Sequence, residues 1–525
     1  MNDVIRIFNA SRRWLAACPP LGAFSISLLA ALGLVASDAM SAEPSLAELI
    51  QAEADGNGID VHEQFFSQQD YAGTGTCLLC HQEAGEQMLD SAHFKWIGKV
   101  ENIEGLKGEQ AGKLSLLNNF CIATASNEGR CTQCHTGYGW KDDSFDFNNP
   151  ENVDCLVCHD QTGQYKKAPT TAGLPDPSVD LQAVASAMRV GAKPTRAACI
   201  GCHAFAGGGD NVKHGDISSD LYVTTKDFDV HMGTNGGDML CVDCHSSNHD
   251  PKTGKVNHGM AGMPLHSVHE GELRSCTDCH GNQKAIHRGT MAGSVLFFDD
   301  WHNRLACQTC HIPAIARKIS TKTEWYWSEA GQNVSPLPID RATGRATYDK
   351  KKGTFKWENN VRPQFRWFNG SWERMVLNVS DTYDEVPIPL ATPQGDRQDP
   401  KAMIYPFKMM VGNQPVDPVN QRVMVPHLFG GAGGPNPYWS KFDWNLAIED
   451  GAAVTGQPFS GEVDFVDTTM FLTVNHEVAP AAAALGQGGL FSGCMDCHGL
   501  PDNTVDWQAL GWTDDPLFGG EIAEQ

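Results

Sequence analysis

The longest run of apolar residues in the chain lies close to its N-terminus. This run, residues 21–36, follows three arginines and precedes small residues around positions 37–42. A basic segment, a short apolar core and small residues at a cleavage point are typical of a secretory signal peptide. We therefore predict a signal peptide over residues 1–42, cleaved near position 39 or 42. A retained membrane anchor is the alternative, but the run is short for a membrane span.

Downstream of residue 42 the hydrophobic pattern predicts no further membrane segment, and hence no stable membrane insertion after cleavage. The 53 glycines and 28 prolines favour loops over long regular elements. Hydrophobic residues make up 41% of the chain and charged residues 19%, a composition typical of folded soluble proteins. The formal net charge of −24 argues against nucleic acid as a partner, because phosphate binding requires basic surfaces.

Cysteine is the most informative residue type. Sixteen of the 18 cysteines fall into eight copies of the pattern C-x-x-C-H. The copies are Cys77, Cys80 and His81; Cys131, Cys134 and His135; Cys155, Cys158 and His159; Cys199, Cys202 and His203; Cys241, Cys244 and His245; Cys276, Cys279 and His280; Cys307, Cys310 and His311; and Cys494, Cys497 and His498.

The spacing of this motif has a physical reason. Two cysteines three positions apart can both bond to the vinyl groups of one porphyrin, and the following histidine then lies under the iron as an axial ligand. Structural zinc sites do not need a histidine after every cysteine pair, and disulfide scaffolds do not use a single spacing. The sequence therefore predicts a multihaem c-type cytochrome with eight haem c groups.

The motifs also divide the chain. Seven of them crowd into residues 77–311, whereas the eighth follows only at Cys494, after a long gap. We expect a haem core over residues 43–311, a haem-free segment over 312–489 that packs on it, and the last motif with a C-terminal tail over 490–525. Because the haems replace much of an ordinary core, we expect mainly α and coil structure with little β.

Each iron also needs a sixth ligand or stays open to substrate. Twelve histidines lie outside the motifs, which is enough for most haems to have two histidine ligands. Methionines are alternatives, and His266 competes with His269. The favoured candidates are His93, His214, His231, His249, His269, His287, His302, His427 and His476.

Several segments outside the motif spacing resemble one family. They include Asn118–Ile122, Arg130–Asp142 around the second motif, Gly163–Lys167, Gly207–Asp216 and Val425–Gly430. The segments resemble the octahaem tetrathionate reductases, which are periplasmic cytochromes, and the likeness extends from about Cys77 to Trp512. The resemblance implies a periplasmic oxidoreductase that reduces tetrathionate, and also nitrite and hydroxylamine.

The resemblance also implies where catalysis occurs. In that family the active haem is attached at the second motif and carries a lysine amine as its distal ligand, here opposite His135. By position this lysine is Lys166 or Lys167, with Lys141 as a weaker choice. Burial beside the haem must lower the pKa of such an amine, because only a neutral amine can bind iron.

An anionic substrate in an acidic protein requires a locally basic pocket. Candidates in the haem-free segment are Lys350, Lys351, Lys352, Lys356 and Arg366, with Trp357, Trp367 and Trp372 as walls. Cys121 is the one cysteine outside the motifs after residue 42. We expect a buried inert thiol, although its position near the second motif also permits a role in sulfur chemistry.

Three functions remain open at this level. The first is a terminal reductase that receives electrons from a redox partner protein or a membrane quinol dehydrogenase. The second is a conduit in which every iron is closed by two ligands. The third is an oxidative enzyme similar to the hydroxylamine oxidoreductases, which also carry eight haems.

Overall fold

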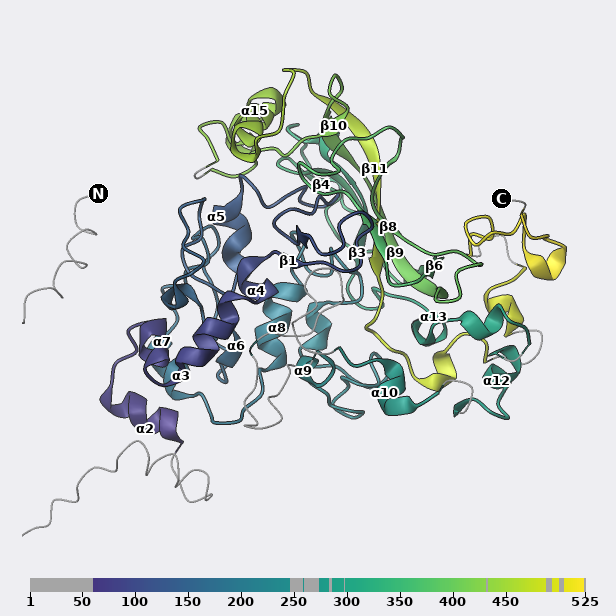
Figure 1. Ribbon diagram of the computed structural model, residues 1–525, viewed down its shortest axis with the longest axis horizontal. Helices are drawn as coiled ribbons and strands as arrows, with labels where there is room; N and C mark the ends of the chain where they lie inside the picture. Colours follow the sequence, from purple (N-terminus) through teal and green to yellow (C-terminus); the bar gives the residue numbers. More distant parts are fainter. Residues whose placement is uncertain are drawn as a thin grey trace, which may run out of the picture.

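The computed structural model describes residues 60–245, 258, 273–282, 286–296, 298–430, 433–487, 493–499 and 505–523. The predicted signal peptide and the candidate ligands His249, His266 and His269 lie outside these residues. Figure 1 shows short helices gathered in one half of the molecule and a large sheet in the other. No helix in the described part of the chain has the length and apolar character needed to cross a membrane.

The cysteine motifs lie on short helical turns joined by loops. The elements that carry them are α3 (Thr74–Leu89), α5 (Glu128–Cys131) with η1 (Thr132–Cys134), α6 (Leu156–His159), α8 (Arg196–His203), α9 (Cys241–Cys244), α10 (Cys276–His280), α13 (Cys307–His311) and η7 (Cys494–Asp496). A helical turn is sufficient for this motif, because it places two cysteines three positions apart on one side.

The remaining described helices are also short. They are α2 (Val61–Gln68), α4 (Ala92–Lys95), α7 (Leu181–Ser186), α12 (Met291–Leu296), α14 (Tyr438–Lys441) and α15 (Trp444–Thr455), with 3₁₀ turns η2 (Pro150–Asn152), η3 (Ser219–Leu221), η4 (His302–Arg304), η5 (Trp327–Glu329), η6 (Ala481–Ala483) and η8 (Pro516–Phe518). Local signals define α15, since the side chain of Asp443 caps its N-terminus and Gly456, at a φ of 73°, ends it.

The described residues form a nine-stranded mixed sheet and a two-stranded one. The small sheet pairs β1 (Gly98–Lys99) with β2 (Gln110–Ala111). The large sheet has the order β4-β5-β3-β9-β11-β8-β7, and β6 and β10 also pair with β9. Its strands are β3 (Thr321–Tyr326), β4 (Tyr348–Asp349), β5 (Gly353–Glu358), β6 (Gln364–Phe368), β7 (Trp372–Arg374), β8 (Ile388–Pro393), β9 (Met403–Asp417), β10 (Arg422–Val423) and β11 (Asp464–Thr473).

The expectation of mainly α and coil structure was therefore wrong. The structure has 26% helix and 19% strand. All nine strands of the large sheet come from the segment between the seventh and eighth motifs. This segment has no cysteine motif to bring in a haem, so it must build a core from its own side chains. Strand β9 shows how it does so, because buried positions recur along all fifteen of its residues.

The sheet packs directly on the motif-bearing half. Its main core cluster contains Trp325, Trp372 and Phe407 together with Leu117 and Ile122, which come from the chain just before the second motif. Hydrogen bonds reinforce this contact, since the amide of Leu117 donates to the carbonyl of Met375 over 3.1 Å. The sheet thus forms a wall beside the second motif.

Candidate functional site

Seven of the eight motif histidines lie opposite a histidine from elsewhere in the chain. The two ring centres are 5.8–6.3 Å apart in every pair. The pairs are His81 with His62, His159 with His258, His203 with His93, His245 with His476, His280 with His231, His311 with His287 and His498 with His302.

This spacing fits a haem iron between each pair of rings. Two imidazoles that share one metal through bonds of about 2 Å hold their ring centres roughly 6 Å apart. Iron binds the neutral imidazole, and burial lowers the pKa of His159 to about 4 and that of His203 to about 3. The residues present therefore fit covalently attached haem with two histidine ligands at seven motifs.

The structure places some of the candidate distal ligands next to motif histidines and others away from them, and the division differs from the sequence ranking. It brings five of the favoured residues, His93, His231, His287, His302 and His476, against motif histidines. It also brings His62 and His258, which the ranking passed over. Their only signal was that they belong to the twelve histidines outside the motifs.

Two favoured candidates have other neighbours. The ring of His427 is fully buried, and its Nδ1 lies 3.4 Å from Oδ2 of Asp450. His214 stacks on no motif histidine among the described residues, although the charges of Asp216 and Lys213 act on it. The ligand assignments themselves stay predictions, which these placements rank.

Contacts between thiols place the motifs in a spatial order. The thiols lie close enough to interact in four pairs: Cys77 with Cys155, Cys134 with Cys202, Cys199 with Cys241 and Cys276 with Cys307. Electrostatic interactions also link Cys158 with Cys199, Cys244 with Cys276 and Cys310 with Cys497. Numbered along the chain, the motifs therefore follow each other as 1, 3, 4, 5, 6, 7 and 8, and motif 2 branches off at motif 4.

The second motif differs from the others at its histidine. No histidine among the described residues stacks on His135; aromatic rings surround it instead. The ring centres of Phe94, Trp96 and Trp140 lie 5.1, 5.5 and 4.9 Å from that of His135. Its Nε2 donates a hydrogen bond to the carbonyl of Phe94 over 2.6 Å. In this arrangement Nε2 is engaged by the protein backbone.

A buried lysine lies beside the same turn. The side chain of Lys167 is 3% exposed, and its Nζ donates to the carbonyls of His135 and Gly137, the latter over 2.8 Å. The same Nζ lies 3.0 Å from Oδ2 of Asp154, whose side chain is fully buried. That carboxylate also accepts hydrogen bonds from Tyr165, over 2.5 Å, and from Tyr138, over 3.0 Å.

The two other candidate lysines lie in water. The side chain of Lys166 is 61% exposed, and its Nζ is 3.7 Å from Oδ2 of Asp176. Lys141 is also exposed. Adjacent residues in an extended segment point to opposite sides, so only Lys167 of the Lys166–Lys167 pair turns toward the motif.

The predicted basic pocket in the haem-free segment is dispersed. Lys350 lies over the ring of Phe442, and Lys351 over that of Trp439. Lys352 pairs with Asp349, and Lys356 pairs with Glu324 and Glu358. Arg366 pairs with Asp506. The three tryptophans are apart as well. Trp372 belongs to the main core, Trp367 donates to the carbonyl of Leu510, and Trp357 donates to that of Ala346.

Cys121 lies against the main core, close to the second motif. Burial raises the pKa of its thiol, against the opposing charges of Lys352, Lys322 and Lys113. A thiol with a raised pKa stays protonated near neutral pH and is a poor nucleophile.

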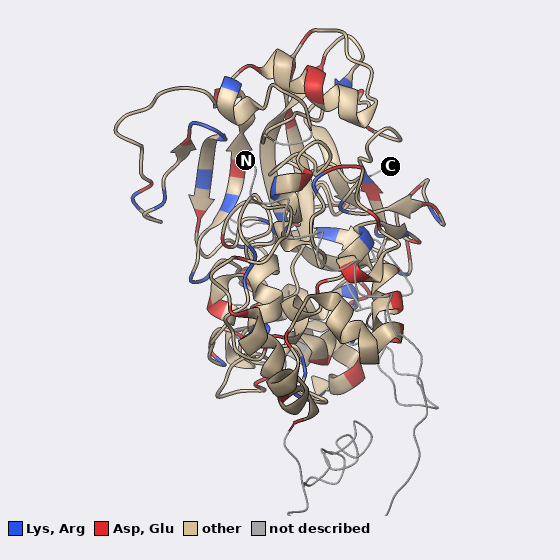
Figure 2. Ribbon diagram, turned by 90° about the vertical axis from the view of Figure 1, so that its left-hand side faces the viewer, with Lys and Arg blue, Asp and Glu red and all other residues tan. Residues whose placement is uncertain are grey.

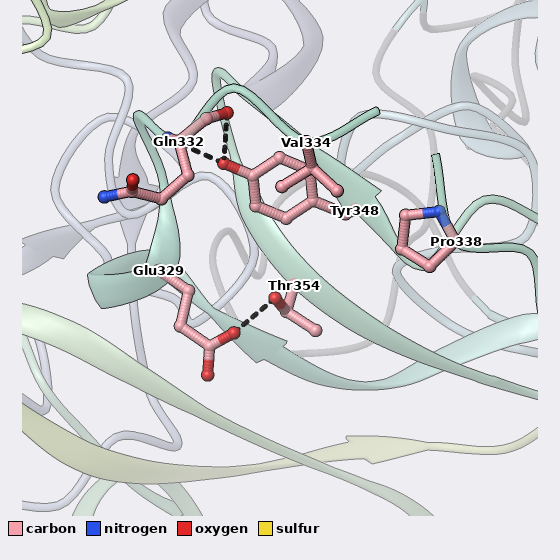
Figure 3. Close-up of a pocket in the computed structure, with 6 residues that line it drawn as sticks. All are labelled: Glu329, Gln332, Val334, Pro338, Tyr348 and Thr354. Carbon is pink, nitrogen blue, oxygen red and sulfur yellow. Dashed lines mark hydrogen bonds between the residues drawn. The ribbon is translucent and has the colours of Figure 1, made fainter. Parts of the chain in front are cut away.

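A hollow near the edge of the large sheet lies among other residues. Its lining consists of Glu329, Gln332, Val334, Pro338, Tyr348 and Thr354 (Figure 3). The hydroxyl of Tyr348 bonds to the amide and the carbonyl of Gln332, each over 2.8 Å. Because this lining contains neither a motif residue nor a candidate ligand, we do not assign the redox chemistry to it.

Comparisons with known proteins support the pattern of motifs. A family model described as bacterial cytochrome c matches residues 322–500. A crystal structure of an octahaem cytochrome c from Shewanella oneidensis shares 35% sequence identity and a TM-score of 0.75; the match covers 89% of this chain and all of that one. The chain belongs to the multihaem cytochromes c. An uncharacterised protein of Archaeoglobus fulgidus is 27% identical over 234 residues, which is 36% of this chain and 77% of that protein.

Membership in this family agrees with the placement of the motif residues. A multihaem cytochrome c holds its haems through thioether bonds and axial nitrogen ligands. Seven motifs of this cytochrome have a second histidine in position for that role, and the second motif has a buried lysine. The second motif is therefore the candidate site for chemistry other than electron transfer.

Proposed function

We propose that this cytochrome is an exported octahaem reductase of small anions, with tetrathionate as substrate and nitrite and hydroxylamine as further substrates. The observation that carries the proposal is the second motif, where Lys167 lies at the turn and no described histidine faces His135. An iron closed by two imidazoles conducts electrons but offers no position to a substrate. A site without a second histidine leaves room for one.

We assign Lys167 as the residue whose amine would be the distal ligand of a haem held at the second motif, opposite His135. Its Nζ already lies at the carbonyls of His135 and Gly137, on the same side as the motif turn. The Nε2 of His135 donates to the carbonyl of Phe94, a bond that it would give up in order to hold an iron opposite Lys167. An amine is displaced more easily than an imidazole, so a substrate could take the place of Lys167.

The surrounding residues hold the amine of Lys167 next to the motif turn. Oδ2 of Asp154 lies 3.0 Å from Nζ, and Tyr138 and Tyr165 fix that carboxylate by hydrogen bonds. An ion pair of this kind stabilises the protonated lysine, whereas only a neutral amine can bind iron. Lys167 would therefore have to give up its proton and its contact with Asp154 in order to hold an iron.

The haems, when bound, supply the iron that accepts, stores and passes electrons. Contacts between motifs join the second motif to a row of seven others through Cys134 and Cys202. Such a row can deliver several electrons in succession, as reduction of a sulfur–sulfur or nitrogen–oxygen bond requires.

The test uses the exported, haem-loaded protein, reduced without oxygen and then mixed with tetrathionate, nitrite or hydroxylamine. The measurement is the rate of reoxidation of the haem absorption band in the wild type and in Lys167→Ala. Lys166→Ala is the matched control, because it removes the neighbouring, exposed amine. We expect fast reoxidation in the wild type and the control, and a large loss in Lys167→Ala.

Reoxidation by a small redox protein serves as the control for folding, and it should stay unchanged in all three proteins. If that protein reoxidises the wild type and none of the three substrates does, the chain is a conduit and the reductase proposal is wrong.

A further inference from the structure

Three cations near the second motif lack an anionic partner among the described residues; Lys213 and Arg374 are partly buried, and Lys113 is exposed. They are Lys113, Lys213 and Arg374, and none of them forms an ion pair with a carboxylate in the described part of the chain. The Nε of Arg374 is buried and has no hydrogen-bond partner among the described residues. A partly buried charge is stabilised by an opposite charge nearby. Lys213 and Arg374 are therefore suited to hold an anion.

The three cations come from segments that the fold brings together. Lys113 begins a segment that runs along the end of β7, where the amide of Leu377 donates to the carbonyl of Ser115 over 2.9 Å. Arg374 is the last residue of β7. Lys213 follows the glycine loop after the fourth motif, and a Cβ built on Gly207 would lie only 3.2 Å from the Cβ of Lys213. This close approach requires glycine in the loop.

The electrostatics agree with this placement. Burial, together with the charges of Lys113 and Arg374, lowers the pKa of Lys213 to about 8. Burial likewise lowers the pKa of Arg374 to about 10. The charged forms of Lys213 and Arg374 are therefore disfavoured by their surroundings, and a bound anion would stabilise both.

The cluster also lies next to the proposed reaction site. The Nζ of Lys113 is 3.5 Å from the centre of the Trp96 ring, which packs against His135 at 5.5 Å. The charge of Lys113 acts on Cys131 and Cys134 of the second motif, and the charge of Lys213 acts on His203 of the fourth. In the view of Figure 2, Lys and Arg positions are interspersed with Asp and Glu positions along the ribbon.

We propose that Lys113, Lys213 and Arg374 form the site that binds an oxyanion substrate next to the second motif. This inference rests on the proposed function and names the residues that select its substrates. Lysine and arginine bind oxyanions through charge-assisted hydrogen bonds, and the fork of Arg374 suits two oxygens at once. The three cations should strengthen the binding of a dianion such as tetrathionate most and that of a monoanion such as nitrite less. They should have little effect on the binding of hydroxylamine, which is uncharged at neutral pH.

The test compares these substrates in single variants of the haem-loaded protein. We expect Lys213→Met and Arg374→Met each to raise KM for tetrathionate by about ten-fold or more, because each removes a charge-assisted hydrogen bond. The increase should be smaller for nitrite and within about two-fold for hydroxylamine. Arg374→Lys, which keeps the charge, should recover part of the tetrathionate KM even if Arg374→Met folds poorly.

Lys356→Met is the matched control, because it removes one lysine charge at an exposed position paired with Glu324 and Glu358. Its KM values should equal those of the wild type. Equal losses for all three substrates, together with a shifted reduction potential, would show that the cations pair with haem propionates, and would overturn the inference. A wild type that reduces none of the substrates would instead refute the proposed function.

Discussion

The assignment of axial ligands leads to the sharpest prediction, because the sequence ranking and the structure disagree on four residues, two of which are His214 and His258. The structure places His258 with its ring centre 6.1 Å from that of His159, whereas His214 faces no motif histidine among the described residues. The ranking favoured His214 and passed over His258. Replacing each with alanine therefore separates the two assignments.

The size of the expected spectral change follows from the number of haems that share the signal. If one of eight haems loses its second histidine, about one eighth of the iron changes from six-coordinate low-spin to five-coordinate or water-bound high-spin. Electron paramagnetic resonance of the oxidised protein measures this fraction directly. We expect His258→Ala to add that high-spin signal and His214→Ala to add none.

Haem content per chain must be the same in the two variants and the wild type, so that a missing haem is not mistaken for a missing ligand. A new high-spin signal in His214→Ala with an unchanged spectrum in His258→Ala would refute the pairing inferred from ring distances. A change in both would mean that His214 controls the position of a ligand from outside the pair.

Three further predictions concern the protein around the haems. Because burial raises the pKa of Cys121, we expect iodoacetamide to modify this thiol only after denaturation, as followed by mass spectrometry; rapid modification at pH 7.5 would contradict this. Phe407 is fully buried among the rings of Phe368, Trp372 and Phe471, so Phe407→Ala should lower the free energy of unfolding by about 3–5 kcal/mol, seen as a lower urea midpoint. Burial lowers the pKa of Lys408 to about 7, so the unfolded chain binds more protons than the folded one between about pH 7 and 10. The wild type should therefore gain stability as pH rises through this window, and the same urea titrations should show a flatter dependence in Lys408→Met.

The sequence predicted the cofactor-binding residues because their chemistry requires fixed local spacing. Cys77, Cys80 and His81 illustrate this, since the thioether bonds and the axial ligand all lie within one helical turn. Distal ligands have no such spacing. His258 meets His159 from a hundred residues away, and only the tertiary structure brings the two together.

The prediction of the fold class was wrong for a related physical reason. The haem motifs dominate the sequence and favour short helices, and they give no sign of strands in the haem-free segment over residues 312–489. That segment is a mixed sheet whose central strand, β9, pairs with β3, β6, β10 and β11. The buried positions along β9 did contain a signal, because a chain without haem must bury its own side chains to fold.

The order of the motifs relates this architecture to the proposed chemistry. Covalent attachment would hold each haem at its motif, so neighbouring thiols would place haems side by side, and the row from motif 1 to motif 8 would then form a path for electrons. Motif 2 touches this row through Cys134 and Cys202 and is not a step within it. A substrate bound at the second motif would therefore not interrupt the path. Haems at motifs 3 and 5, on either side of motif 4, could then resupply the second motif with electrons. Such a branch suits a reductase that consumes several electrons per substrate, whereas a simple conduit has no need of it.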